Sequence, residues 1–212
     1  MRKLSALFTI VFFAAALPSF AGTGKQGTQT AGKGDPPSLC DSIAGNLVQN
    51  CGFETGDFTD WTGGGNFEFS IVTSDSTYVN SGTYGAQLGP VGSDGTLSQT
   101  ISDTVGGAYS LSFWLYNDNG TPNDFSVQWN GTTILNVGTD VGPFPFTDFT
   151  VAGLVGTGSD TLQFSFRQDP LYWGLDDISL TSSSSTVPEA GSMVLFGTAL
   201  GLAALLIQRR AL

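Results

Sequence analysis

The sequence has no histidine, two cysteines and seven basic residues among its 212 positions. Without histidine, serine–histidine and cysteine–histidine catalysis are excluded, as are zinc and iron sites built on imidazole. Between Cys40 and Leu180, Arg167 is the single basic residue against sixteen acidic ones, a formal charge of −15 for that segment. Without a basic patch to displace phosphate counterions, nucleic acid is excluded as a partner. Calcium and neutral sugars are compatible with this charge, and solubility alone also accounts for it.

The segment between Cys40 and Leu180 also has no convincing amphipathic helix, and period-two alternation recurs in its place. The pattern predicts strands at 66–72, 109–116, 124–129 and 161–167, and shorter ones at 47–51, 96–101, 133–137, 146–151 and 173–180. Asn130-Gly131 predicts a tight hairpin turn, because both residues accept positive φ angles. About nine or ten short strands predict an all-β fold, a jelly-roll β-sandwich.

Alternation also assigns the two faces of each strand. The inward set is Tyr109, Leu111, Phe113, Leu115, Phe125, Val127, Trp129, Leu162, Phe164 and Phe166. The outward set is polar with two aromatic rings, and its ligand-binding candidates are Trp114, Tyr116, Gln128, Gln163 and Arg167. Rings that stack on pyranose faces, beside amide and guanidinium donors, are what a sugar-binding surface needs. In the alternative interpretation, the two rings pack under a loop or under the leader.

The N-terminus has the three parts of a secretory signal peptide. A positive start at Arg2-Lys3 precedes a mainly apolar stretch, and small residues before Ala21 suit signal peptidase. We predict residues 1–21 as the signal peptide, with an uncleaved anchor as the alternative. Residues 22–39 are then a flexible leader, 40–180 the β-sandwich domain and 181–186 a Ser/Thr linker.

The C-terminus has an uncharged segment of 18 residues, Ala190–Ile207, followed by Arg209 and Arg210. As a helix it would span roughly 27 Å, just enough to cross a bilayer core of about 30 Å. The trailing arginines favour a cytoplasmic C-terminus. We predict a short transmembrane helix here, and a plain C-terminal anchor is the alternative to the sorting signal described next.

Val187-Pro188-Glu189, the apolar helix and the terminal arginines together resemble the PEP-CTERM sorting signal, over residues 187–212. The family usually has proline after the glutamate, whereas this chain has Ala190. The resemblance implies processing by an exosortase-type enzyme, with membrane contact only before processing. It further implies export to the cell surface or extracellular matrix of a Gram-negative bacterium.

Cys40 and Cys51 are the lone pair of cysteines in a chain expected to be exported. Such a pair predicts a disulfide, and two reactive thiols are the alternative. The bond would close a loop of about a dozen residues and stabilise the fold by roughly 3 kcal/mol.

The stretch Asn50–Trp61 resembles the opening of galactose-binding-like jelly rolls, which include several carbohydrate-binding module families, and Trp173–Leu180 resembles their last strand. The resemblance implies a structural calcium held by Glu54 and Asp177, with backbone carbonyls near Ser81 and Thr83. Calcium takes six to eight hard oxygen ligands, which such a set would supply. In the alternative interpretation these carboxylates cap turns.

Two acidic pairs could be mistaken for a glycosidase site, which needs two carboxylates around one bond. Asp57 and Asp60 lie in a turn, where aspartate commonly caps the backbone. Asp176 and Asp177 are adjacent on a strand, so their side chains should face opposite ways. We therefore predict an exported, non-enzymatic carbohydrate-binding protein with a neutral polysaccharide as partner. The alternative is a structural envelope or biofilm protein without specific sugar binding.

Overall fold

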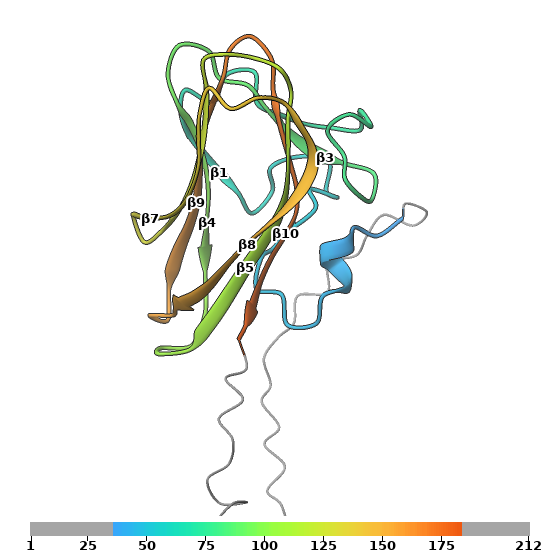
Figure 1. Cartoon of the computed structure of the whole chain (residues 1–212). Coiled ribbons are helices and arrows are strands. Elements are labelled where there is room, and N and C mark those ends of the chain that lie inside the picture. The colour runs from blue at the N-terminus through green and yellow to red at the C-terminus, as the bar shows by residue number, and fades with distance from the viewer. Residues whose placement is uncertain (1–35, 184–212) are drawn as a thin grey trace, which may run out of the picture.

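The computed structural model describes residues 36–183, and within them it has ten β-strands and one 3₁₀ helix (Figure 1). The helix η1 covers Leu39–Ser42. The strands are β1 Thr62–Gly65, β2 Ile71–Thr73, β3 Gly85–Leu88, β4 Gly95–Ile101, β5 Ala108–Asn117, β6 Asn123–Trp129, β7 Thr132–Thr139, β8 Phe144–Val155, β9 Asp160–Gln168 and β10 Trp173–Ser182. The all-β prediction is confirmed for this part of the chain.

The strands form two five-stranded antiparallel sheets that face each other (Figure 1). The first sheet has the order β1-β4-β9-β6-β7, and the second has the order β2-β3-β10-β5-β8. Nearly every neighbouring pair joins strands that are distant in sequence, while β6 and β7 form the predicted hairpin. Its turn residues Asn130 and Gly131 have φ angles of 50° and 75°. This architecture is the predicted jelly-roll sandwich.

The core lies between the sheets and is rich in aromatic rings. Phe113 of β5 stacks on Phe149 of β8 at 5.7 Å and meets Phe164 of β9 edge-on at 5.3 Å. Trp173 is fully buried against Phe125. All ten residues predicted to point inward are buried. The period-two pattern therefore identified the core face of β5, β6 and β9 correctly.

Two predicted strands are wrong. Residues 47–51 form no strand: the backbone bends at 49–50 and turns at Cys51, and it bonds to β10 at single points such as Leu47 N–H to Leu180 O. Residues 66–72 alternate in sequence, yet Phe69 has a φ of 59° and the strand β2 begins only at Ile71. A positive φ at a non-glycine residue interrupts extended backbone, so the pattern there belongs to a turn.

Among residues 36–183, the structure has no helix with the length and apolar character needed to cross a bilayer. The predicted signal peptide, nearly all of the leader and the sorting segment 187–212 lie outside the described residues. So do the sorting residues Val187, Pro188, Glu189, Arg209 and Arg210. Their roles stay predictions.

Candidate functional site

The outer face of the second sheet carries a group of aromatic side chains. Because Phe113 and Leu115 of β5 point into the core, Trp114 and Tyr116 point outward, and both are partly exposed. Tyr116 contacts Phe146 of β8 at 5.7 Å and Tyr78 at 5.9 Å, and Tyr78 contacts Tyr172 at 5.8 Å. We call these five residues the aromatic face: Tyr78, Trp114, Tyr116, Phe146 and Tyr172.

Gly174 of β10 has no side chain, which gives these rings room to pack over the strand. It is paired with Tyr116 across the sheet, and a Cβ there would lie 3.1 Å from the Phe146 ring and 3.2 Å from the Tyr116 Cβ. Such contacts are tight for any real side chain. The missing side chain therefore allows rings from two flanking segments to pack closely on the sheet.

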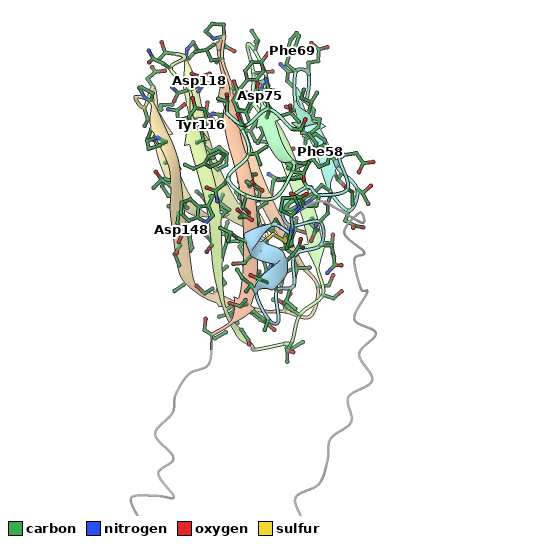
Figure 2. The ribbon with its side chains drawn as sticks, turned by 90° about the vertical axis from the view of Figure 1, so that its right-hand side faces the viewer. Phe58, Phe69, Asp75, Tyr116, Asp118 and Asp148 are labelled. Atoms are coloured by element: carbon green, nitrogen blue, oxygen red, sulfur yellow. A yellow bond between two sulfur atoms is a disulfide. The ribbon has the colours of Figure 1, made fainter. Side chains whose placement is uncertain are left out.

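Carboxylates lie beside the aromatic face. The hydroxyl of Tyr78 donates to Asp118 Oδ2 at 3.3 Å, and Asp148 is the direct cross-strand partner of Trp114. Figure 2 looks onto this face and shows Asp75 and Asp118 near Tyr116, with Asp148 further along the sheet. Burial raises the pKa of both Tyr78 and Tyr116, and the charge of Asp118 raises them further.

The structure separates the five predicted ligand-binding residues. Gln128 is on β6, and Gln163 and Arg167 are on β9, so all three belong to the outer face of the first sheet. Trp114 and Tyr116 lie on the opposite side of the sandwich. The prediction of one shared face is therefore wrong, because alternation tells inward from outward but does not tell one sheet from the other.

The outer face of the first sheet is polar. Gln163 Nε2 donates to Gln128 Oε1 at 3.5 Å, and Arg167 forms an ion pair with Asp169 at 2.6 Å. Asp124 is the cross-strand partner of Arg167. Burial, with a smaller repulsion from Asp94, raises the pKa of Asp124 to about 6, although Arg167 opposes the shift.

The predicted calcium residues lie where the N-terminal segment packs against the outer side of β10. Glu54 accepts hydrogen bonds from the backbone N–H groups of Thr83 and Tyr84. Asp177 accepts hydrogen bonds from the backbone of Cys40, the hydroxyl of Ser81 and the amide of Asn80. Ser81 and Thr83 thus point O–H and N–H donors at these two carboxylates, whereas the prediction expected their backbone carbonyl oxygens beside the metal.

The charge balance of this region suits a cation. Burial raises the pKa of Glu54, and the nearby charges of Asp41 and Asp177 raise it further. Arg167, the one basic residue within 36–183, belongs to the other sheet and pairs with Asp169. Hard carboxylate oxygens without a cationic partner are the ligands that calcium prefers. The chemistry of these residues therefore fits a calcium ion. A bound ion would compete with the hydrogen-bond donors that contact Asp177.

Asp176 and Asp177 do not face opposite ways, which corrects the expectation from strand alternation. Asp177 has a φ of 49°, and the pairing of β10 with β5 shifts register between Asp176 and Ser179. As a result, Asp176 accepts hydrogen bonds from the backbone N–H groups of Asn80 and Ser81, while Asp177 accepts hydrogen bonds from the side chains of the same two residues. The bulge points both carboxylates at one loop. Burial, then the charge of Asp177, raises the pKa of Asp176 to about 8.

The predicted disulfide between Cys40 and Cys51 is present, with an S–S distance of 2.01 Å. The bond joins Cys40 of η1 to Cys51, and Cys51 O accepts a hydrogen bond from the N–H of Ile178 in β10. The disulfide therefore holds the η1 segment close to β10. Asp41 lies within 4.8 Å of both sulfurs, but sulfurs in a disulfide are not thiolate ligands, so this group is no metal centre. Asp57 caps its turn as expected, since it accepts the N–H of Thr59 at 2.9 Å.

A family model described as a carbohydrate binding domain matches residues 45–134. Among solved structures, TmCBM61 in complex with β-1,4-galactotriose has a TM-score of 0.56 and 23% sequence identity, covering 65% of this chain and 99% of that one. This likeness shows the fold: the described part of the chain has the β-sandwich architecture of that carbohydrate-binding module.

Two further solved structures have lower TM-scores. A family 35 carbohydrate binding module from Clostridium thermocellum has a TM-score of 0.42 at 16% identity, covering 60% of this chain and 95% of that one. The CBM22-1 xylan-binding domain from Paenibacillus barcinonensis Xyn10C has a TM-score of 0.45 at 14% identity, covering 62% and 90%. No curated protein matches the chain.

Sequence reasoning found Trp114 and Tyr116 but missed their neighbours. Tyr78 and Tyr172 come from loops, and Phe146 comes from the β8 strand at the sheet edge. The loop residues follow no alternation, so nothing in the local pattern marked them. Gly174, the one glycine of the closing strand, was the available signal of close packing at that point.

Proposed function

We propose that this chain is an exported, non-catalytic protein that binds polysaccharide through the aromatic face. The observation that carries the proposal is the set of rings around Tyr116, in a fold shared with carbohydrate-binding modules: Trp114, Tyr116, Phe146 and Tyr172 are partly exposed, and the buried ring of Tyr78 supports Tyr116 and Tyr172. Such rings stack on the apolar faces of neutral sugar units, and neighbouring carboxylates such as Asp118 accept hydrogen bonds from sugar hydroxyls.

A panel of neutral polysaccharides tests the proposal, with affinity electrophoresis or calorimetry as the measurement. Trp114→Ala and Tyr116→Ala should each weaken binding roughly tenfold or more, because a stacked ring is worth about 1–3 kcal/mol. Gln163→Ala, on the opposite side of the sandwich, should keep the affinity. Loss of binding in Gln163→Ala alone would move the site to the first sheet, and no binding to any glycan would favour a structural role.

We further propose that residues 1–21 direct export and that residues 187–212 are a PEP-CTERM-type signal processed by an exosortase-type enzyme, which delivers the domain to the cell surface or matrix. The support is the order Val187-Pro188-Glu189, apolar segment, Arg209-Arg210. Mass measurement of the mature protein tests this: we expect a C-terminus near Glu189, and a chain that still ends in Leu212 would make the segment an anchor.

We also propose that a structural calcium joins Glu54 and Asp177. The uncompensated carboxylates between the N-terminal segment and β10 support this assignment. When bound, the ion would hold that segment against the last strand.

A further inference from the structure

Each outward ring of β5 has a carboxylate next to it. Trp114 and Asp148 are directly opposite on β5 and β8, at a separation where cross-strand side chains interact. Asp118 follows β5 immediately, accepts a hydrogen bond from the hydroxyl of Tyr78 and lies close enough to Tyr116 to raise its pKa. The negative groups therefore lie beside the rings that are expected to stack on a ligand.

These carboxylates have no cationic partner within residues 36–183. The one basic residue there, Arg167, faces outward from the first sheet and is paired with Asp169. Asp148 is exposed, and Asp118 is partly exposed. Neither carboxylate is paired with a positive charge, so the aromatic face is an electronegative surface that repels acidic sugars.

A neutral sugar would stack on the rings but would bring no positive charge to the carboxylates. A sugar with an ammonium group would stack on the rings and also neutralise a carboxylate. The ammonium group could pair with a carboxylate and could also lie against a Tyr or Trp ring, whose face attracts cations. We propose that the aromatic face prefers polysaccharides that carry free amino groups, that is, hexosamine units without N-acetylation. This inference rests on the proposed sugar-binding function and names the ligand class of that site.

The experiment uses two ligands that differ only in the amino group, the hexamer of β-1,4-linked glucosamine and its fully N-acetylated form. The purified protein is titrated with each at a pH where the amines are protonated. We expect the amino form to bind about tenfold more tightly in low salt, from weak charge contacts with Asp118 and Asp148. This preference should shrink as added salt screens the exposed charges.

Variants separate charge from stacking. In Asp148→Asn and in the double variant with Asp118→Asn, the affinity for the amino form should fall more than the affinity for the N-acetylated form. Asp94→Asn, which removes one exposed charge just before β4 and near Arg167 of the first sheet, is the matched control and should keep the preference. Near-ultraviolet circular dichroism checks that the rings keep their packing in each variant.

Three outcomes would overturn the inference: equal affinity for both hexamers, a preference that survives in the double variant, or equally tight binding of a lysine hexamer, which would show charge attraction without sugar recognition. In the first case binding of either form still supports the proposed function. If neither hexamer nor any neutral polysaccharide binds, the proposed function itself fails.

Discussion

Gly174 of β10 lies directly across from Tyr116 of β5, and a Cβ at Gly174 would come within 3.2 Å of the Tyr116 Cβ. Valine at this position suits a strand by propensity, but its branched side chain would push Tyr116 and Phe146 apart. We therefore expect Gly174→Val to fold, to change the near-ultraviolet circular dichroism of the rings and to lower glycan affinity several-fold.

Gly142→Val is the control for Gly174→Val, because a Cβ at Gly142 meets no atom within 4 Å and its φ is not positive. It should leave both the spectrum and the affinity in place. If Gly174→Val binds glycan as the natural chain does, the close ring packing has no part in recognition.

Asp177 combines a structural role with the proposed metal role, and asparagine separates the two. Asparagine tolerates the φ of 49° and keeps a side-chain acceptor for Ser81, but it removes the charge. The stripped natural chain should melt roughly 5 to 10 °C higher when calcium is added in large excess over its dissociation constant. Asp177→Asn should lose most of this rise, measured by scanning calorimetry.

The matched control for the metal site is Asp57→Asn. Asp57 belongs to the same N-terminal turn region as Glu54, but its carboxylate caps Thr55 and Thr59. Its calcium response should remain. An absence of any calcium response in the natural chain would leave Glu54 and Asp177 as turn-capping residues.

The disulfide should stabilise the domain rather than form its site. Replacing both Cys40 and Cys51 by alanine should lower the free energy of unfolding by about 3 kcal/mol, because the open loop gains conformational entropy in the unfolded state. Urea unfolding of oxidised and reduced natural chain and of the double variant measures this. The reduced chain and the double variant should agree, and an unchanged midpoint in both would mean that contacts such as Ile178 N–H to Cys51 O hold the segment without the bond.

The sequence predicted β5, β6 and β9 well because their side chains alternate between the core and the outer face, as in β5, where Leu111, Phe113 and Leu115 are fully buried. It missed β1 and β3, whose sequences Thr62–Gly65 and Gly85–Leu88 carry too few large side chains to alternate. These strands are fixed by pairing with distant partners, β4 for β1 and β10 for β3. The local sequence pattern of a strand does not show which distant strand pairs with it.

The same limit explains the site. Alternation placed Trp114 and Gln163 correctly on outward faces, but only the sheet order reveals that these faces are opposite. The closing Asp176-Asp177 pair was predicted to diverge because a regular strand alternates, and a bulge turned both toward Asn80 and Ser81. Bulges depend on long-range packing, here on the loop and the N-terminal segment that cover β10.

Asp124 should make stability depend on pH. Its pKa in the folded protein is about 6, against about 3.9 for an unperturbed aspartate. As pH rises from the lower to the higher value, the unfolded chain releases this proton while the folded chain keeps it, so stability falls across that window and levels off above it. Asp124→Asn should flatten this part of the profile, measured by urea unfolding at each pH. Other raised carboxyls, such as Asp176, contribute equally to both chains, so the difference between the two profiles isolates Asp124.

Arg167 supplies the second half of that test. Its guanidinium lowers the pKa of its cross-strand partner Asp124, against the effects of burial and Asp94. Arg167→Gln should therefore move the folded-state pKa of Asp124 above 6 and extend the declining part of the stability profile to higher pH. Carboxyl chemical shifts from an NMR titration follow Asp124 directly. A pKa that stays the same, or falls, in Arg167→Gln would mean that the ion pair with Asp169 already uses up the attraction of the guanidinium.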